Sequence, residues 1–279
     1  MKVAIQGHQG SFHHQAARQF FNKNLGLVMA DSFSDTFAAI KNGEAEYAVV
    51  AIENSLYGSI NNVYDLLLEN KYPIVGEIYL HINFVLAGVE GATLEDISEV
   101  YSHYAALGEC ANYLTSKLPN AKRLENDDTA KSAEDVAGWN DKSKAVICSR
   151  EAAEKNNLYI IEDRIQDHEE NYTRFVIVQN NGKPTKDANK TSLVLTTKAD
   201  TKSGSLHSAL GAFAKNGINL SMLQSRPLVG KAWHYLFYID FDKSEDDPSF
   251  VAAKSELDQL GWHVEVLGSY KSAQDSVAT

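Results

Sequence analysis

The chain has 279 residues, which suggests about two domains at roughly 150 residues each. Hydrophobic residues make up 44% and charged residues 23%, a composition that excludes the collagen-like, disordered and low-complexity classes. The net charge of −11 disfavours nucleic acid or an anionic membrane as a partner. No run approaches the roughly 18 apolar residues of a membrane helix, so we expect no membrane partner. Two thiols, Cys110 and Cys148, are too few for a disulfide framework, which favours a cytoplasmic setting.

The front of the chain alternates short apolar runs with amphipathic ones. Strands are predicted at 2–6, 47–53, 73–80, 81–88, 100–101, 144–148 and 174–179. Helices are predicted at 11–22, 60–70, 105–118, 130–137 and 151–157. This alternation predicts parallel sheets that are covered by helices.

A polar stretch with Gly and Pro at 180–190 reads as a linker to the back of the chain. Beyond it, strands are predicted at 191–197, 219–227, 233–241 and 263–267, and helices at 205–216 and 249–260. The resulting βαββαβ order predicts a ferredoxin-like module.

Small polar clusters follow the predicted strands of the front segment five times, at 7–11, 53–55, 102–103, 128–129 and 149–150. Ligands of α/β proteins bind beyond the carboxyl ends of strands, and free helix N–H groups there favour anions. One interpretation is therefore a cleft for a small carboxylate, in which His103 is the histidine of interest. The other is helix capping, which uses the same residue types. The repetition favours a site.

The segment 171–175 places a hydroxyl, a cation and an aromatic ring at the start of a strand. Arg174 is suited to bidentate binding of a carboxylate, and Thr173 can donate a hydrogen bond. The alternative is an ordinary strand entry with a surface arginine, and the spacing does not decide between the two. No P-loop, Gly-x-Ser-x-Gly or His-Glu-x-x-His motif occurs. His13 and His14 are adjacent and point to different faces of a helix, so no metal site is expected.

Together these motifs resemble the prephenate dehydratase family over nearly the whole chain. The resemblance is carried, in order, by the segments 7–17, 53–67, 102–110, 128–130, 145–149 and 171–175, and at the back by 204–206 and 224–227. The family usually has His-Pro-Gln-Ala-Leu-x-Gln-Cys in the third of these blocks. Here Tyr104, Ala105 and Glu109 replace the proline and both glutamines, so the amide donor of that block is missing. In the first block His8 replaces a proline, and Ser11 replaces a threonine but keeps the hydroxyl.

The resemblance implies a fold and its domains. Residues 1–182 would form a two-lobed α/β catalytic domain that resembles type II periplasmic binding proteins. Lobe one would hold about 1–79 and 160–182, and lobe two about 80–159. Residues 191–270 would form an α+β, ferredoxin-like ACT regulatory domain.

The family's reaction, as the resemblance implies, converts prephenate to phenylpyruvate, carbon dioxide and water on the route to L-phenylalanine, with no metal and no cofactor. Thr173 would donate to the departing hydroxyl, Arg174 would bind a carboxylate, and Phe175 would form an apolar wall. The expected substrate-binding residues are polar side chains at strand ends, namely Ser11, Asn54, Ser55, Thr129 and Asn171. Two alternatives stay open: the same chemistry on arogenate, and a non-catalytic sensor of a small carboxylate in the same cleft.

The ACT resemblance implies regulation by L-phenylalanine and a homodimer or homotetramer. The expected effector-binding residues lie at the start of one helix and on one strand, namely Ser203, Gly204, Leu206, Leu210 and Gln224. Gln224 stands where the family usually has an acid, so the ammonium group of the effector would meet a neutral partner. Because a charge-assisted hydrogen bond is about twice as strong as a neutral one, we expect weakened binding.

Overall fold

A computed structural model describes residues 1–21, 25–197, 203–228, 230–231 and 233–273. Its contacts divide the chain into two compact units. The first unit comprises Met1–Gly58 and Tyr79–Phe175, and the second comprises Ser59–Ile78 and the chain from Val176 onward. No helix in the described part of the chain is long and apolar enough to span a membrane.

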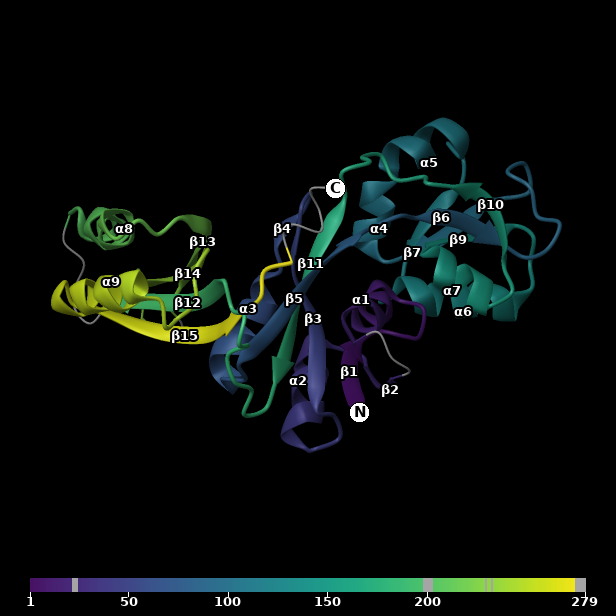
Figure 1. Cartoon of the computed structure of the whole chain (residues 1–279). Helices are drawn as coiled ribbons and strands as arrows, with labels where there is room; N and C mark the ends of the chain where they lie inside the picture. The colour runs from purple at the N-terminus through teal and green to yellow at the C-terminus, as the bar shows by residue number, and fades with distance from the viewer. Residues whose placement is uncertain (22–24, 198–202, 229, 232, 274–279) are drawn as a thin grey trace. The chain divides into compact units, whose positions relative to one another are not determined.

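The first sheet has the strand order β2-β1-β3-β11-β5, with the short β4 (Gly58–Ser59) beside β3. Its strands are β1 (Lys2–Gln6), β2 (Gly26–Ala30), β3 (Tyr47–Asn54), β5 (Ile74–His81) and β11 (Tyr172–Gln179). Strand β1 runs parallel to β2 and β3, and helices α1 (Phe12–Phe21) and α2 (Phe33–Lys41) pack on these strands (Figure 1). Six of the eight residues of β3, its final Asn54 included, are buried, as expected for a strand covered on both faces.

The second sheet lies wholly in the first unit and has the order β10-β6-β9-β7-β8. Its strands are β6 (Val85–Gly88), β7 (Glu99–Ser102), β8 (Lys122–Glu125), β9 (Lys144–Cys148) and β10 (Tyr159–Asp163). Strand β7 is parallel to β8 and β9, whereas β6 is antiparallel to β9 and β10. The prediction of parallel sheets is therefore correct only in part, because this sheet is mixed.

The helices of this sheet are α4 (Tyr104–Glu109), α5 (Ala111–Lys117), α6 (Thr129–Trp139) and α7 (Arg150–Lys155). In Figure 1, α6 and α7 lie together on one side of the strands and α5 on the other. The single helix predicted at 105–118 is divided at Cys110, which leaves the helical conformation. The cause is a new helix start, because the Asp167 carboxylate accepts hydrogen bonds from the backbone N–H groups of Asn112 and Tyr113.

The expected return to the first sheet at about residue 160 is wrong. Strand β10 pairs with β6 in the second sheet, from Tyr159 opposite Gly88 to Asp163 opposite Val85. The chain returns to the first sheet only at β11. An apolar run shows that a strand is present, but not which sheet edge it joins.

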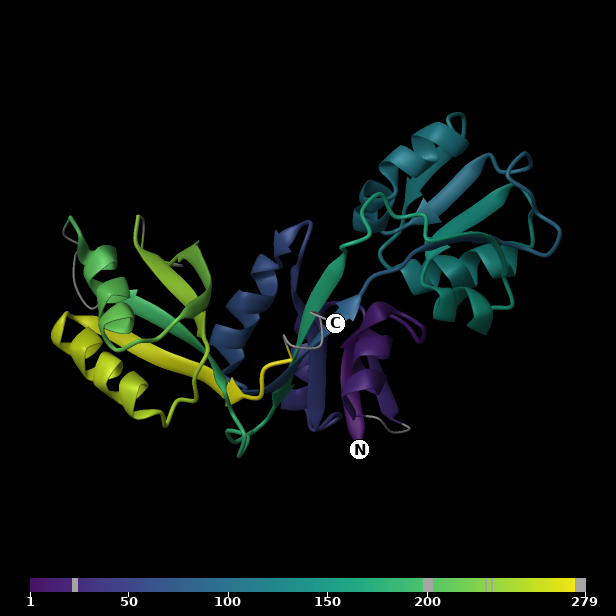
Figure 2. The same cartoon turned by 45° about the horizontal axis from the view of Figure 1, so that its top comes forward.

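The second unit contains a four-stranded antiparallel sheet of order β13-β14-β12-β15. Its elements are β12 (Lys190–Thr197), α8 (Ser205–Lys215), β13 (Leu220–Pro227), β14 (Tyr235–Phe241), α9 (Pro248–Gln259) and β15 (Trp262–Tyr270), which is the βαββαβ order that the sequence predicts. Helices α8 and α9 lie side by side on this sheet (Figures 1 and 2). They cover the face that carries Leu193, Ile239 and Phe241.

Helix α3 (Asn61–Asn70) packs against the opposite face of the same sheet. Side chains alternate between faces along β14, so Tyr238 points away from α8 and α9. Its hydroxyl donates to the backbone oxygen of Tyr64 at 2.9 Å, and the two rings lie 4.7 Å apart. Both faces of the sheet are therefore covered within the second unit.

Candidate functional site

Strand β11 begins where β3 and β5 end, which brings three distant segments of the first unit together. The Ser55 N–H donates to Tyr172 O at 2.8 Å, and the Ile82 N–H donates to Asn171 O at 2.8 Å. The Ser55 hydroxyl also donates to Glu170 O and accepts from the Tyr172 N–H, each at 3.0 Å. Backbone bonds on both sides thus fix the start of β11.

Asn54 joins this strand start to the end of β3 through its side-chain amide. Its Nδ2 donates to Asn171 Oδ1 at 2.9 Å and to Thr173 Oγ1 at 3.0 Å. Its Oδ1 accepts from the backbone N–H groups of Leu56 at 2.8 Å and Tyr57 at 3.0 Å. Because a backbone N–H can only donate, the oxygen of Asn54 must face these two groups. The orientation of the amide follows from this requirement.

The direction of these bonds determines what Thr173 can do. Its oxygen accepts from Asn54, so its own O–H proton is left to be donated to a different acceptor. Thr173 is 8% exposed, and Asn54 beside it is 9% exposed. The site therefore holds a partly shielded hydroxyl in the donor orientation, at the place where the sequence predicts a donor.

Asn171 extends the network to a carboxyl group that the sequence reasoning did not assign to the site. Its Oδ1 accepts from Asn54, so its Nδ2 is the donor to Glu109 Oε2. Glu109 ends helix α4 on its inward side and is 7% exposed. Burial raises the pKa of Glu109 to about 7, against the opposing effect of the Asn171 hydrogen bond. The sequence does hold a signal for this residue, because an acidic side chain next to the apolar Leu107 and Cys110 indicates a buried carboxyl group.

Arg174 does not share a face with Thr173, so it lies outside the Asn54 network, and the expected binding of a carboxylate by Arg174 stays a prediction. Neighbouring residues of a strand point to opposite sides of the sheet. Asn54 and Thr173 meet on one side, whereas Arg174 Nη1 lies 4.0 Å from Glu53 Oε2 on the other. Arg174 is 3% exposed.

Phe175 is a core residue, not a wall of an open site. It is 1% exposed, and its ring meets the ring of His13 edge-on at 5.0 Å. The Nε2 of His13 accepts from the Ala51 N–H at 3.3 Å, and burial lowers the pKa of His13 to about 3. Phe175 and His13 therefore pack α1 against the first sheet.

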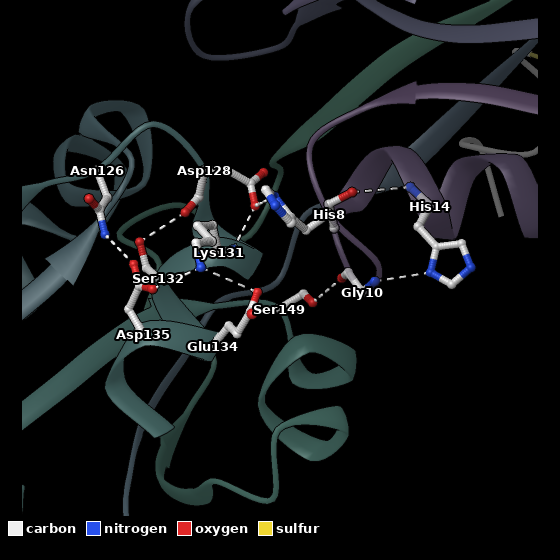
Figure 3. Close-up of polar contacts among 11 residues, drawn as sticks. His8, Gly10, His14, Asn126, Asp128, Lys131, Ser132, Glu134, Asp135 and Ser149 are labelled. Atoms are coloured by element: carbon white, nitrogen blue, oxygen red, sulfur yellow. Dashed lines mark hydrogen bonds and ion pairs between the residues drawn. The ribbon is translucent and has the colours of Figure 1, made fainter. Parts of the chain in front are cut away.

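The loop between β1 and α1 packs against α7 (Figure 3). Gly10 O accepts from the Ser149 hydroxyl at 2.7 Å, and Gly10 N–H donates to His14 Nδ1 at 3.0 Å. Gly10 has a φ of +95°, and a Cβ at this position would lie 2.9 Å from Ala152 Cα. Glycine is thus required here by both backbone conformation and space.

Several of the polar clusters cap helices, as the second interpretation of the sequence holds. Ser11, 2% exposed, accepts from the His14 N–H at 3.3 Å. The Asp128 carboxylate accepts from the Lys131 N–H at 2.7 Å and lies 3.5 Å from His8 Nδ1 (Figure 3). Thr129 follows Asp128 as the first residue of α6. No hydrogen bond among the described residues joins Ser11 or Thr129 to the Asn54 network.

His103, singled out from the sequence, also caps a helix. Its side chain accepts from the Ala105 N–H at 3.3 Å at the start of α4. Burial lowers the pKa of His103, with the charge of Asp128 acting in the opposite direction. Among the described residues, no group of three or more His, Cys, Asp or Glu side chains is placed to hold a metal ion.

In the second unit, a hollow of about 380 Å³ lies at the start of α8. Two of the predicted effector residues, Gly204 and Leu206, line it. Ser205 and several aromatic side chains line it too, among them Trp233, Tyr235 and Trp262. Ser203 and Leu210 are not part of this lining.

Gln224 lies on the other face of the sheet, so the predicted effector set does not form one site within this chain. It pairs in register with Tyr238, and the Ser59 hydroxyl donates to its Oε1 at 3.2 Å. The prediction joined residues from the helix-covered face and the α3-covered face, because sequence motifs do not record strand alternation.

The family model described as Prephenate dehydratase matches residues 3–183. The prephenate dehydratase of Bacillus subtilis (strain 168) is 32% identical over 98% of this chain and 100% of its own. Arogenate dehydratase 3, chloroplastic, of Arabidopsis thaliana is 37% identical over 97% of this chain and 67% of its own.

Two solved structures cover nearly the whole chain. A prephenate dehydratase from Arthrobacter aurescens in complex with L-Phe is 29% identical over 98% of this chain and 91% of its own, with a TM-score of 0.88. A protein described as a novel type of quorum quenching acylase is 30% identical over 99% of this chain and 100% of its own, with a TM-score of 0.87. The match of the family model over most of the chain, together with the full-length relative, shows that this chain belongs to the prephenate dehydratase family of lyases.

Proposed function

We propose that this chain catalyses the decarboxylating dehydration of prephenate to phenylpyruvate, carbon dioxide and water. The observation that carries the proposal is the hydrogen bond from Asn54 to Thr173, whose direction leaves the Thr173 O–H as a donor. In the reaction the carbon–carbon bond to the ring carboxylate breaks, and its electron pair enters the ring. The carbon–oxygen bond to the ring hydroxyl breaks as well, and the departing hydroxide takes up a proton from solvent to become water.

Thr173 assists this departure as a hydrogen-bond donor. Negative charge grows on the leaving oxygen in the transition state, and a donor already held in place stabilises it without reorganisation. One such donor is worth roughly 10²–10³ in rate. The threonine hydroxyl is too weak an acid to transfer its proton fully, so its contribution is the hydrogen bond itself.

The amides around Thr173 supply rigidity and further polar contacts. Asn54 is fixed by two backbone N–H groups, and Asn171 is completely buried. A hydroxyl held by such partners loses little freedom when substrate arrives, which favours the reactive geometry. Ser55 is exposed at the same strand end, and its hydroxyl stiffens the start of β11 by its bonds to the backbone of Glu170 and Tyr172.

Prephenate and arogenate are separated by one direct experiment. Ultraviolet detection of phenylpyruvate after addition of prephenate tests the proposal, and the same protein is assayed with arogenate for phenylalanine. We expect the larger kcat/KM for prephenate. Arogenate is the second candidate substrate, because arogenate dehydratases are 36–37% identical to this chain. The acylase with the same fold shows that fold alone does not decide the activity, and a failure of both assays would contradict the proposal.

We propose further that the second unit contains an ACT domain that binds L-phenylalanine in the hollow at α8. The βαββαβ order supports this, as does the relative solved with L-Phe. The N-cap residue of α8 makes no side-chain cap hydrogen bond, and the carboxylate of the amino acid would lie at this helix start. Calorimetry of the full chain with L-phenylalanine tests the proposal. We expect binding heat that is lost in Gly204→Val, since Gly204 has a φ of +83° and a side chain there is strained.

The same family membership supports three coarser proposals. The two sheets that hold residues of the first unit would form two lobes of the type found in type II periplasmic binding proteins. The chain would act in the cytoplasm, and it would assemble as a homodimer or homotetramer. Edge strand β13, with Leu223 exposed at 44%, offers unpaired backbone groups to a second copy. Light scattering at micromolar protein tests the assembly, and a monomer mass would contradict it.

A further inference from the structure

Glu109 occupies a fixed place at the end of α4 that positions its carboxyl against Asn171. Its backbone oxygen accepts from the Asp167 N–H at 2.7 Å, and its side chain accepts from Asn171 Nδ2. Both residues are buried, with Asn171 at 0% and Glu109 at 7% exposure. In place of the glutamine that the family motif usually has, the chain therefore holds a titratable group that is connected to Thr173 through Asn171 and Asn54.

The surroundings of Glu109 offer its negative charge little compensation. Glu109 acts electrostatically on Tyr57 and Cys110, neither of which can carry a positive charge, and Asp167 acts on the same two groups. In the described part of the chain, no Lys, Arg or His forms an ion pair with Glu109. Burial in such surroundings disfavours the ionised form and raises the pKa of Glu109 to about 7.

The hydrogen-bond network is compatible with a neutral Glu109. When Glu109 is ionised, Oε2 accepts from Asn171. When Glu109 is neutral, Oε2 still accepts, because the proton is then carried by Oε1. A neutral carboxylic acid then has one donor and one acceptor, as a glutamine amide has at the same place. The amide that the sequence lacks is thus reproduced by a protonated acid.

We propose that Glu109 is a positioning residue that works in its neutral form: it anchors Asn171 and through it Asn54 and Thr173, and its ionisation opposes the entry of the dianionic substrate. The inference rests on the proposed function, because the substrate that it concerns is prephenate. Two carboxylates on the substrate repel a buried carboxylate beside the site, so substrate binds with uptake of one proton when Glu109 is ionised.

The test is the pH dependence of turnover in three proteins: wild type, Glu109→Gln and Glu90→Gln. Glu90 is an exposed turn residue and serves as the matched control. For wild type and Glu90→Gln, kcat/KM falls roughly tenfold per pH unit above about pH 7, and the fall lies mainly in KM. For Glu109→Gln, kcat/KM stays level from pH 6.5 to 8.5, to within roughly threefold. A Glu109→Gln profile that falls in parallel with wild type would overturn the inference.

A measurement without turnover separates this inference from the proposed function. Glutamate labelled with ¹³C at Cδ is incorporated into the full chain, and its side-chain resonances are titrated by NMR. The resonance missing from Glu109→Gln identifies Glu109, and we expect its midpoint near pH 7. A midpoint near the ordinary value of a glutamate would overturn the inference even if prephenate is turned over. Absence of turnover in wild type with a midpoint near pH 7 would instead contradict the proposed function and, with it, the role of Glu109 toward substrate.

Discussion

Asn54 decides the chemistry of the site at the scale of single residues. Its oxygen is committed to the backbone N–H groups of Leu56 and Tyr57, so its nitrogen must serve both Asn171 and Thr173. The orientation of the Asn54 amide therefore sets which atom donates in the hydrogen bonds to Thr173, to Asn171 and from Asn171 to Glu109. The Thr173 hydroxyl is therefore oriented by the backbone turn that holds Asn54.

The first prediction reverses this direction by Asn54→Asp. A carboxylate still accepts from the two backbone N–H groups, but it has no N–H to offer Thr173. The Thr173 O–H then donates to Asp at position 54 and is lost to the substrate. We expect kcat to fall by about 10²-fold or more with the fold retained. Steady-state assay and circular dichroism check this, with the exposed Asn120→Asp as a control that keeps wild-type kcat.

The second prediction concerns stability and follows from the same buried carboxyl. Between its ordinary pKa of 4.5 and the folded-state pKa of about 7, Glu109 keeps its proton in the folded state and loses it in the unfolded state. Wild type therefore loses stability as the pH rises through this window, and Glu109→Gln does not. The interval corresponds to roughly 3 kcal/mol. Urea unfolding at pH 5 and pH 8 checks this, and an equal free-energy difference between the two proteins at both pH values would contradict it.

At the scale of elements, the loop between β1 and α1 shows why glycines occur in the first motif. Gly10 combines a left-handed backbone with close contact to α7, and its carbonyl accepts from Ser149. The loop thereby joins the first sheet to a helix of the second within the first unit. The contact with Ala152 leaves no space for a side chain at Gly10.

The third prediction compares two glycine substitutions. Gly10→Ala strains the backbone and places a Cβ against Ala152, so we expect a loss of about 1–3 kcal/mol. Gly138→Ala lies inside α6, where a Cβ would meet nothing within 4 Å, so we expect a gain of about 0.5–1 kcal/mol. Thermal unfolding of both variants checks the signs, and equal melting temperatures would contradict the account of the loop.

Helices and strands were predicted correctly where apolar residues recur at a regular spacing along the whole element. The strand predicted at 47–53 is β3, and the helix predicted at 60–70 is α3. Helix α2 was missed although Ser32 caps it, because its short run of nine residues lies beside polar turns. Strand β8 was missed because its residues Lys122–Glu125 are largely exposed and carry no apolar alternation. Hydrophobic periodicity in the sequence reflects which side chains are buried, so an element that is largely exposed cannot be predicted from it.

The residues of the site were likewise predicted only in part. Asn54, Ser55, Asn171 and Thr173 were grouped from motifs; the side chains of Asn54, Asn171 and Thr173 are joined by hydrogen bonds, and Ser55 bonds to the backbone at the same strand start. Arg174 and Phe175 were grouped with them by adjacency, but alternation along β11 and packing against α1 separate them. Glu109 was noted only as a departure, because its link to Asn171 depends on how α4 meets the start of β11.

At the scale of the whole molecule, the second unit is built around a buried ion pair. Lys190 Nζ lies 3.0 Å and 3.1 Å from the two carboxylate oxygens of Glu77, and the residues are 1% and 3% exposed. Glu77 belongs to β5 and Lys190 begins β12, so the pair joins the four-stranded sheet to β5 within this unit. Removing one partner of such a pair leaves a buried charge without compensation, whereas replacing both partners by apolar residues is often neutral or stabilising.

The fourth prediction separates these two effects. Lys190→Met leaves Glu77 as a buried charge without its cation, and we expect a loss of about 3–5 kcal/mol. The double variant Lys190→Met with Glu77→Leu removes both charges and should recover most of this loss. Urea unfolding of the three proteins checks the prediction. A double variant as unstable as the single one would show that packing, and not the stranded charge, is responsible.

The central claim is that the Thr173 hydroxyl assists the departing hydroxyl of the substrate, and Thr173→Val tests it most directly. Valine keeps the shape of threonine and removes the O–H, while Thr173→Ser keeps the O–H. We measure the rate of phenylpyruvate formation at saturating prephenate. The account predicts at least a 10²-fold lower kcat for Thr173→Val, a kcat within roughly tenfold of wild type for Thr173→Ser, and folded protein in both cases. A Thr173→Val enzyme with near wild-type kcat would contradict the account.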